Sequence, residues 1–395
     1  MANALIEAKN LSFSYPEGEE QGIFDVNFKI NKGEVVLLTG NSGSGKSTLL
    51  KCINGLIPAL YEGDLKGDVL IDGISTKTLG MAKLSHKMGT VFQNPRSQFF
   101  TDDSTAEMVF AMENYGVERG EMRKRLSSLC KEFDVENIMG RKISTLSSGE
   151  RQLLALASAK TLNQDIFLFD EPSASLDYGN CMRLSRIIAK MKKNGMCVIV
   201  ADHRFYYLNG IVDRGFLMDN GRINIFESEE EFRKCPYDTR NISLFDMKIE
   251  RGAKRKAGEI KLKAEGVGYK NILKNISFEL RKGEVCALVG NNGCGKTTLA
   301  KLLCRSVKPS AGKLWSEETP LYIMQDADYQ LFGISVENEL MIAERKLEKK
   351  RVDEALLSLN ISELREKHPF DLSGGQKQRL QIGMALVSDK ELMIF

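Results

Sequence analysis

Residues 33–48 read GEVVLLTGNSGSGKST, where an apolar run from Val35 to Leu38 leads into a glycine-rich loop. The spacing G-x-x-x-x-G-K-S is that of a phosphate loop. Its glycines let consecutive backbone N–H groups curl around an anion, and the helix that follows adds its positive N-terminal end. We expect Lys46 to reach the β- and γ-phosphates of a nucleotide and the Ser47 hydroxyl to bind Mg²⁺. The expected nucleotide-binding residues of this loop are Gly40, Asn41, Ser42, Gly43, Ser44, Gly45, Lys46, Ser47 and Thr48.

The pattern returns in the second half of the chain, which indicates an internal repeat. Residues 283–298 read GEVCALVGNNGCGKTT and place Lys296 over Lys46. GTVFQ at 89–93 is echoed by LYIMQ at 321–325, and LSSGERQ at 146–152 by LSGGQKQ at 372–378. Two loops, each between an apolar run expected to be a strand and an expected helix, favour nucleotide binding over a chance match or a loop that binds phosphate structurally. The second loop comprises Gly290, Asn291, Asn292, Gly293, Cys294, Gly295, Lys296, Thr297 and Thr298.

The composition is that of an ordinary globular protein with more than one domain. The 395 residues are 42% apolar and 28% charged, which excludes a disordered or fibrous chain, and a net charge of +3 does not require a nucleic-acid partner. The longest apolar runs, such as MCVIVA at 196–201, are too short to cross a bilayer, and the N-terminus has no apolar signal core. Eight cysteines without a CxxC pair indicate free thiols in a reducing compartment. We therefore expect the protein in the cytoplasm.

The repeat predicts two domains, residues 1–233 and 259–395, joined by a linker at 234–258. The linker has mixed polarity and a basic cluster at 251–256, which fits a solvated segment or, as the alternative, a patch that touches anionic lipid. Between its lysine and its glutamine the second half is 18 residues shorter than the first. We expect it to lack the counterpart of GDVLIDGISTKTLG at 67–80, which is typical of a strand pair.

Two acids in the first half follow an apolar run and are candidates for the chemistry. Asp170 and Glu171 come directly after the expected strand Ile166–Phe169, at the edge where open α/β sheets place their ligands. We expect Asp170 to hold the magnesium shell and Glu171 to polarise the water that attacks the γ-phosphate. An isolated Asp-Glu pair could also be the solvated start of a helix, but its context favours the catalytic interpretation.

Two further polar residues end expected strands and should reach the same edge. His203 follows Val198–Val200 and would stabilise the charge that develops in the transition state, with a capping or surface role as the alternative. Gln93 ends GTVF and would orient a water and touch the metal, although many glutamines at strand ends do neither. The expected catalytic residues are Glu171, His203 and Gln93, and the expected metal ligands are Ser47, Gln93, Asp170, Thr297 and Gln325.

Tyr15 and Tyr269 precede the two loops at corresponding places in the repeat. Each ring could stack on adenine or pack in a small core, and the chemistry of tyrosine allows both.

The phosphate loop, Gln93, LSSGERQ, FLFDEP at 167–172, SLD at 175–177 and ADH at 201–203 occur in the order seen in ABC-type ATPases, and the chain resembles this family along its length. LSGGQ is rare outside that family. The resemblance implies an α/β fold of two P-loop NTPase domains of the RecA-like ABC type. Each would have a mainly parallel core sheet, an antiparallel β subdomain and an α-helical signature subdomain, the second domain being incomplete. It also implies ATP hydrolysis coupled to transmembrane transport, with ATP and Mg²⁺ as cofactors.

In this family two nucleotide-binding domains face head to tail, and each ATP lies between one phosphate loop and the opposite signature motif. Ser148 and Glu150 stand where the family has glycine and glutamine, and we expect both changes to weaken the second site. The pairing is expected within the chain or with a second ATPase chain. The resemblance adds Ser373, Gly374, Gly375 and Gln376 to the first ATP site and Ser147, Ser148 and Gly149 to the second.

VFQNPRSQFF at 91–100 and STAEMVFAMENYG at 104–116 resemble the ATPases of energy-coupling factor (ECF) importers. There, the segment after the glutamine receives a membrane subunit, so Phe99, Phe100, Leu331 and Phe332 would face a coupling helix, with ordinary core packing as the alternative. Such importers take up vitamins or transition-metal ions through integral membrane coupling and substrate-binding components. This chain would then lie at the cytoplasmic face of the plasma membrane as a peripheral subunit, without a nucleic-acid partner.

Two competing classes are tandem ABC proteins that act on ribosomes and tandem sugar-importer ATPases. The ribosomal proteins resemble one another in a long, charged helical linker, and the linker here is too short. The sequence around Gln93 argues against the sugar importers.

The end of the second half lacks several of the expected site residues. An offset of 226 lays Phe395 over Phe169, so the counterpart of Asp170 would fall at position 396. The second half thus has no counterpart of Asp170, Glu171, Asp177 or His203. Because natural domains rarely stop inside a central strand, we expect the sequence to be a fragment.

Overall fold

The computed structural model describes residues 4–16, 18–93, 97–174, 176–235, 258–344 and 348–395. The chain divides into two compact units, Met1–Arg251 and Gly252–Phe395. The division falls inside the predicted linker at 234–258, but most of that linker, with its basic cluster at 251–256, lies outside the described residues. The exact domain bounds therefore stay a prediction.

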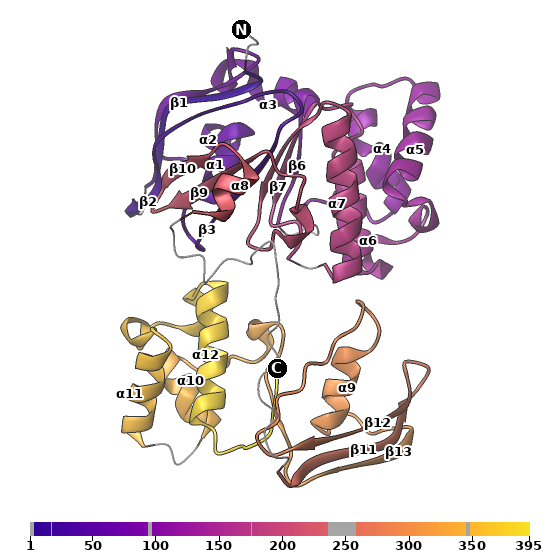
Figure 1. The fold of residues 1–395 in the computed structure, drawn as a ribbon, viewed down its shortest axis with the longest axis vertical. Helices are drawn as coiled ribbons and strands as arrows, with labels where there is room; N and C mark the ends of the chain where they lie inside the picture. The colour runs from indigo at the N-terminus through magenta and orange to yellow at the C-terminus, as the bar shows by residue number, and fades with distance from the viewer. Residues whose placement is uncertain (1–3, 17, 94–96, 175, 236–257, 345–347) are drawn as a thin grey trace. The chain divides into compact units, whose positions relative to one another are not determined.

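A six-stranded sheet forms the centre of the first unit (Figure 1). Its order is β10-β9-β3-β8-β7-β6, and all neighbours are parallel except β9 and β10. Val35 and Leu37 of β3 pack in one hydrophobic core, whereas Val36 and Leu38 pack in another, because successive side chains of a strand point to opposite faces. Both faces of the sheet are thus covered, which explains the continuous apolar runs in the sequence. The strands are β3 (Val35–Gly40), β6 (Met88–Val91), β7 (Ile166–Asp170), β8 (Cys197–Ala201), β9 (Arg214–Asp219) and β10 (Arg222–Phe226).

A second, antiparallel sheet of order β2-β1-β4-β5 belongs to the same unit. Helix α1 (Lys46–Ile53) contributes Leu49, Leu50 and Ile53 to the core that also holds the buried residues of this sheet. The strand pair expected at 67–80 is confirmed, since β4 pairs with β5 and α3 follows. The elements are β1 (Ile6–Tyr15), β2 (Gly18–Ile30), β4 (Asp64–Ile71), β5 (Ile74–Ser75), α2 (Leu56–Ala59) and α3 (Thr76–Lys87).

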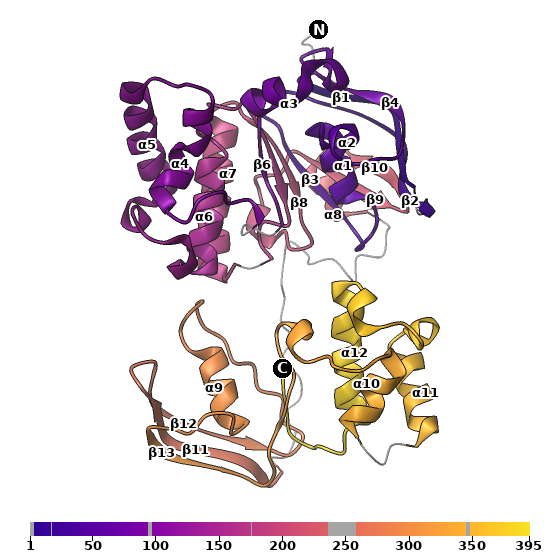
Figure 2. The same cartoon turned by 180° about the vertical axis from the view of Figure 1, so that it is seen from behind.

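The helices α4, α5 and α6 gather at one side of the first unit, and α7 lies between them and the parallel sheet (Figures 1 and 2). This cluster carries the LSSGERQ motif at the start of α6. The helices are α4 (Ser104–Asn114), α5 (Arg119–Phe133), α6 (Ser148–Ser158), α7 (Tyr178–Lys193) and α8 (Glu229–Arg233), with 3-10 turns at Glu136–Ile138, Ile143–Thr145 and Tyr206–Leu208.

The second unit has an antiparallel sheet with α9 against it and a separate cluster of α10, α11 and α12 (Figure 2). The sheet has the order β12-β11-β13. Two short strands, β14 (Leu321–Tyr322) and β15 (Met393–Ile394), form a parallel pair. The other elements are β11 (Ile260–Tyr269), β12 (Leu273–Arg281), β13 (Ala311–Ser316), α9 (Lys296–Leu303), α10 (Val336–Ala343), α11 (Lys349–Ser358) and α12 (Gly374–Val387), with 3-10 turns at Ala327–Tyr329, Ser362–Leu364 and Pro369–Asp371.

The sequence repeat is also a structural repeat. In the first unit Gly89 of β6 is the register partner of Phe167 of β7. In the second unit Leu321 of β14 is the partner of Met393 of β15. Residues 89 and 321 differ by 232, as Gln93 and Gln325 do, and 167 and 393 differ by the 226 that separates the two signature motifs. The two units therefore share the same strand register, and the α/β fold of two P-loop domains is confirmed.

One expectation about the second unit is only partly right, and another is wrong. Its antiparallel sheet contains β13, which pairs with β11 as β4 pairs with β1, so within the described residues it is the counterparts of β5 and α3 that are absent. The apolar run at 285–289 does not form a strand. Val285 is 98% exposed, whereas its counterpart Val35 is fully buried. In the first unit β3 is paired on both sides, with β8 and β9, and the described second unit holds no counterparts of those two strands.

Candidate nucleotide site

The phosphate loop of the first unit joins β3 to α1 through glycines that no other residue replaces without strain. Gly40 has φ +142°, and a Cβ atom there would lie 2.2 Å from the carbonyl oxygen of Met218. Gly45, the residue before α1, has φ +105°. These conformations suit glycine alone, because it has no Cβ atom to clash with the neighbouring backbone. The loop thereby brings backbone N–H groups and the N-terminus of α1 to one place.

Lys46 is only 5% exposed and its ammonium group donates to the loop itself. Its Nζ lies 2.9 Å from the carbonyl oxygen of Gly40 and 2.9 Å from that of Asn41. Burial lowers the pKa of Lys46, and the charges of Glu171 and Asp170 oppose that shift. The lysine therefore lies beside the loop with acids close enough to stabilise its charge, as the phosphate-binding role requires.

Ser47 and Asp170 meet as predicted. Ser47 Oγ donates to Asp170 Oδ1 over 3.1 Å, although the two residues lie far apart in the sequence. Burial raises the pKa of Asp170, while the hydrogen bond from Ser47 lowers it. A hydroxyl and a carboxylate are the oxygen donors that Mg²⁺ takes from proteins, and the ion draws its remaining ligands from water and phosphate. This donor set fits Mg²⁺, and no cluster of three or more His, Cys, Asp or Glu residues suited to another metal occurs in the described chain.

Glu171 stands at the centre of the predicted catalytic residues. Gln93 Nε2 donates to Glu171 Oε2 over 2.7 Å, and His203 Nε2 lies 3.2 Å from Glu171 Oε1. The hydrogen bond from His203 lowers the pKa of Glu171, against the effect of burial, so the carboxylate is ionised and can accept a proton at neutral pH. The structure thus brings together Gln93, Glu171 and His203 from the ends of β6, β7 and β8.

The backbone of Glu171 has an unusual conformation, with φ +48°. Its N–H group donates to the carbonyl oxygen of Ala201 over 2.7 Å, at the end of β8. A non-glycine residue in this left-handed region is strained and persists only when its surroundings hold it. The position of this carboxylate is therefore set by the tertiary structure as well as by the strand before it.

The two signature motifs begin their helices with the same reciprocal cap. Ser147 Oγ accepts from the N–H of Glu150, and the Glu150 carboxylate accepts from the N–H of Ser147. Ser373 and Gln376 make the same pair at the start of α12. Glu150 therefore replaces glutamine in a capping box that accepts either residue.

The weakening of the second site that we expect from Glu150 stays a prediction, but the charge of Glu150 has a partner within its own unit. Arg141 Nη1 lies 3.1 Å from Glu150 Oε1. Burial favours the neutral form of Glu150, but the hydrogen bonds from Ser147 and the charge of Arg141 lower its pKa overall. The carboxylate is thus ionised, turned toward the helix cap and paired with a cation. Gly149 is also constrained, since a Cβ atom there would lie 2.4 Å from Asn180 Nδ2, whereas Gly374 and Gly375 are open to solvent.

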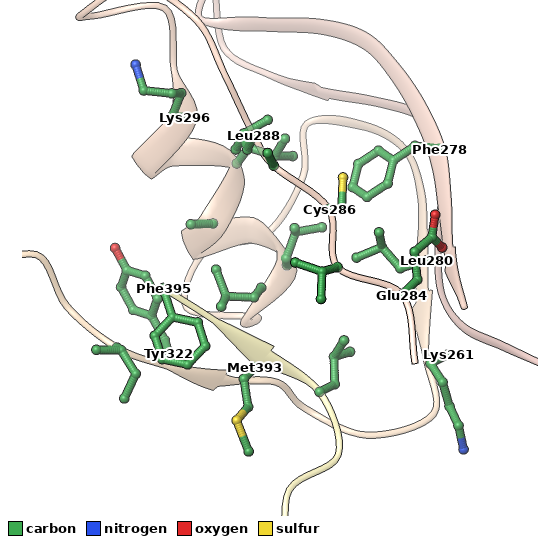
Figure 3. Close-up of a pocket in the computed structure, with 18 of the residues that line it drawn as sticks. Lys261, Phe278, Leu280, Glu284, Cys286, Leu288, Lys296, Tyr322, Met393 and Phe395 are labelled. Atoms are coloured by element: carbon green, nitrogen blue, oxygen red, sulfur yellow. The ribbon is translucent and has the colours of Figure 1, made fainter. Parts of the chain in front are cut away.

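The second phosphate loop keeps its local shape without a supporting strand. Lys296 Nζ donates to the carbonyl oxygens of Gly290 over 2.7 Å and Asn291 over 2.9 Å, as Lys46 does in the first unit. Lys296, Thr297 and Gln325 line one largely apolar hollow of about 1530 Å³. Figure 3 shows Lys296 and Leu288 on one side of it and Met393 with Phe395 on the other.

Tyr15 and Tyr269 take part in packing. Tyr15 OH lies 3.3 Å from Thr48 Oγ1, and its ring meets Phe13 edge-on at 4.9 Å. Tyr269 packs against the small core of the second unit, and Lys270 Nζ lies 5.3 Å from its ring centre. Both rings make the contacts of the core-packing alternative, and adenine stacking stays a prediction.

The profile described as ABC transporter matches residues 23–174 and 273–395. A putative ABC transporter ATP-binding protein of Treponema denticola is 38% identical over 419 residues, covering 99% of this chain and 85% of that protein. The chain belongs to the ABC transporter ATP-binding family. It is therefore an ATP-binding protein and an ATPase.

Other relatives of the ABC family carry more specific descriptions. The putative HMP/thiamine import ATP-binding protein YkoD of Bacillus subtilis is 29% identical, covering 99% of this chain and 80% of that protein. The structure of cbiO1 from Clostridium perfringens, described as part of the ABC transporter complex cbiONQ, matches with a TM-score of 0.53 and 26% identity over 59% of this chain and 92% of that one. Of the helices in the described parts of this ABC chain, none has both the length and the apolar character that a membrane span needs.

The apolar residues that follow Gln93 and Gln325 divide into exposed and buried positions. Phe100 and Phe332 are 76% and 78% exposed, and Phe100 stacks on Phe110 at 5.0 Å. Leu331 is 1% exposed and belongs to the core of the second helical cluster, and Phe99 packs partly against the core of the first unit. The core-packing alternative is therefore confirmed for Leu331, while Phe100 and Phe332 are accessible.

Sequence reasoning missed three buried acids in this ABC protein. Glu107 and Glu339 lie in the first turns of α4 and α10 and bond the loops that carry Phe100 and Phe332. Glu107 and Glu339 are 232 residues apart, as Gln93 and Gln325 are, so the internal repeat could have identified them as a corresponding pair. The third, Asp202, sits beside His203 at the end of β8. The ADH motif contained it, but its neighbours come from other segments.

Proposed function

We propose that the chain is the ATP-hydrolysing subunit of an ECF-type importer for a vitamin or a transition-metal ion. The similarity to a protein described as a thiamine-import ATPase and to one described as part of the cbiONQ transporter complex supports an importer. The arrangement that carries the proposal is the contact of one carboxylate, Glu171, with both Gln93 and His203, beside the Ser47–Asp170 pair.

In the proposed reaction Glu171 is the general base. Its ionised carboxylate accepts a proton from the attacking water, which Gln93 helps to hold, and His203 lies on the other carboxylate oxygen, where it can donate toward the γ-phosphate. Lys46 would leave the loop carbonyls to contact the β- and γ-phosphates. Ser47, Asp170 and Gln93 would hold Mg²⁺, which supplies charge neutralisation of the phosphates when bound.

Each ATP would be shared between a phosphate loop and a signature motif from the other domain. The helix starts at Ser147 and Ser373 support this, because the partial positive charge at a helix N-terminus favours a bound anion. The first site would combine the Lys46 loop with Ser373, Gly374, Gly375 and Gln376, and the second the Lys296 loop with Thr297, Gln325, Ser147, Ser148 and Gly149. Domains 1–233 and 259–395 would pair within the chain or with a second ATPase chain.

The exposed rings of Phe100 and Phe332 are the proposed contacts for the membrane partners. An apolar side chain that is about three-quarters exposed is better placed to bind a partner than to stabilise its own domain. The partners would be integral coupling and substrate-binding components, which would hold the chain peripherally at the cytoplasmic face of the membrane.

Glu171→Gln in the full chain tests the proposed chemistry. The amide keeps the size of the side chain and removes the base, so ATP binding should persist while turnover falls about 10²- to 10⁴-fold. Turnover at the wild-type rate would refute the assignment of the base. Glu113→Ala, on the exposed end of α4, is the matched control for expression and folding.

Purification of the tagged chain from native membranes tests the importer class. Small integral membrane proteins in stoichiometric amounts would support the ECF assignment. Recovery with ribosomes, or with a sugar-binding permease, would replace it by one of the two competing classes.

A further inference from the structure

Asp202 is a buried acid that the proposed reaction does not use. It follows β8 directly, is 2% exposed, and its N–H group donates to the carbonyl oxygen of Leu38 in β3 over 3.1 Å. Charged side chains are almost never fully buried unless they are paired, so its position requires an explanation.

The carboxylate of Asp202 is surrounded by donors from three segments. The segment that carries His203 supplies two N–H groups, the turn after Glu171 supplies Ser173, and the 3-10 turn beyond supplies Tyr207. Oδ1 accepts from His203 N at 2.7 Å, Arg204 N at 2.9 Å and Ser173 Oγ at 3.0 Å, and Oδ2 accepts from Tyr207 OH at 2.7 Å and Ser173 N at 3.3 Å. Ser173 and Tyr207 are themselves 0% and 1% exposed.

The five hydrogen-bond donors around the two oxygens of Asp202 favour an ionised carboxylate at this position. An ionised carboxylate offers about four lone-pair positions and no proton, whereas an amide of the same shape has one acceptor oxygen and an NH₂ group. Burial raises the pKa of Asp202, and the hydrogen bonds from Arg204, Tyr207 and Ser173 oppose the shift. The donors are therefore matched to a carboxylate, and an asparagine would place its NH₂ group against the Ser173 N–H.

The segments that Asp202 joins carry Glu171 and His203, the two residues of the proposed catalytic pair. Glu171 is held in its left-handed conformation by a bond to Ala201, the residue before Asp202, and its own carbonyl oxygen accepts from the N–H of Ala174. Ser173 lies inside that turn, and His203 lies on the other side of Asp202. The 3.2 Å approach of His203 Nε2 to Glu171 Oε1 therefore depends on two segments that share this one carboxylate.

We propose that Asp202 is a positioning residue for ATP hydrolysis, which locks the His203 loop to the turn after Glu171 so that imidazole and carboxylate stay in contact. This inference rests on the proposed roles of Glu171 and His203. Asp202 does not touch the nucleotide in this account, so its loss should impair turnover and leave nucleotide affinity nearly unchanged.

Asp202→Asn in the full chain is the test, measured as steady-state ATPase activity. We expect kcat to fall at least tenfold, with KM for ATP within about twofold of wild type, because the side chain acts through Glu171 and His203 alone. Ser173→Ala, which removes one of the five bonds, should lower kcat by a smaller factor in the same pattern, and it decides the matter if the asparagine variant does not fold. A wild-type kcat in the folded Asp202→Asn variant, or a wild-type kcat in Ser173→Ala where Asp202→Asn does not fold, would overturn the inference.

A spectroscopic readout separates positioning from a general loss of structure. The chain has three histidines, His86, His203 and His368, so imidazole signals in NMR spectra are few enough to assign by substitution. In Asp202→Asn we expect the His203 signal to move toward its position in Glu171→Gln, while those of His86 and His368 stay. An unmoved His203 signal would contradict the proposal that Asp202 fixes the position of the His203 loop.

The two proposals can fail independently. If Glu171→Gln hydrolyses ATP at the wild-type rate, the proposed catalytic assignment falls. If Glu171→Gln is inactive and Asp202→Asn is fully active, only the positioning role of Asp202 falls.

Discussion

Glu107→Ala should release the loop that presents Phe100. Glu107 is 5% exposed, and its Oε2 atom accepts from Phe100 N at 3.0 Å, Thr101 N at 3.0 Å and Thr101 Oγ1 at 3.1 Å. The alanine variant leaves two backbone N–H groups without this acceptor. A hydrogen bond to a charged group contributes about 1.5–3 kcal/mol, and bonds that share one acceptor atom are not additive. We therefore expect the loop to lose about 3 kcal/mol of protection against local opening.

Amide hydrogen exchange of the segment around Phe100 and Thr101 measures this effect directly. Since about 1.4 kcal/mol corresponds to a factor of ten, exchange should accelerate on the order of 10²-fold in this segment. Glu113→Ala on the same helix, an exposed position, should leave exchange unchanged. Exchange within twofold of wild type in Glu107→Ala would refute the idea that the carboxylate holds the loop.

The second unit provides an internal replicate. Glu339 is 1% exposed, and its Oε2 atom accepts from Phe332 N at 2.8 Å and from Gly333 N. Glu339→Ala should therefore accelerate exchange around Phe332 and leave the Phe100 segment protected. A uniform acceleration of amide exchange in both units would indicate global destabilisation and not the loss of the local hydrogen bonds to Glu339.

Three further outcomes are expected. Gly40→Ala should weaken ATP binding at least tenfold in a nucleotide titration, because its Cβ atom would lie 2.2 Å from a backbone oxygen and φ is +142°. Ser47→Ala should raise the Mg²⁺ concentration for half-maximal ATPase activity, since it removes the hydroxyl beside Asp170. The pKa of Glu171 is lowered from 4.5 in the folded state, so its stabilising contribution is present above that value and lost as the pH falls below it. The difference in unfolding midpoint between wild type and Glu171→Gln should therefore shrink as the pH is lowered from 7 to about 4.

Motif spacing and strand periodicity were enough to predict most of the first site. Gln93, Glu171 and His203 each follow an apolar run, and parallel strands bring their carboxyl ends to one edge of a sheet. The contacts of Glu171 with the other two confirm the geometry that this reasoning predicts. Their chemical roles are not decided by geometry alone and stay proposals.

The buried acids could not be predicted in the same way. Asp202 has its donors on Ser173, Tyr207 and the two residues after it, and Ser173 lies 29 residues earlier in the sequence. A pattern read along one strand contains no information about which other segments converge on a side chain. Glu150 illustrates the same limit, because the signature motif alone does not show that Arg141 pairs with its carboxylate.

Comparison of the two units separates what a phosphate loop needs from what a hydrolysis site needs. Lys296 contacts Gly290 and Asn291 as Lys46 contacts Gly40 and Asn41, even though the residues before the second loop are exposed and form no strand. The loop conformation is therefore local, set by its glycines and the helix that follows. The contact of Glu171 with Gln93 and His203 instead requires β6, β7 and β8 to be aligned side by side. A glycine-rich motif thus predicts nucleotide binding from sequence, whereas catalysis has to be argued from the strands that surround it.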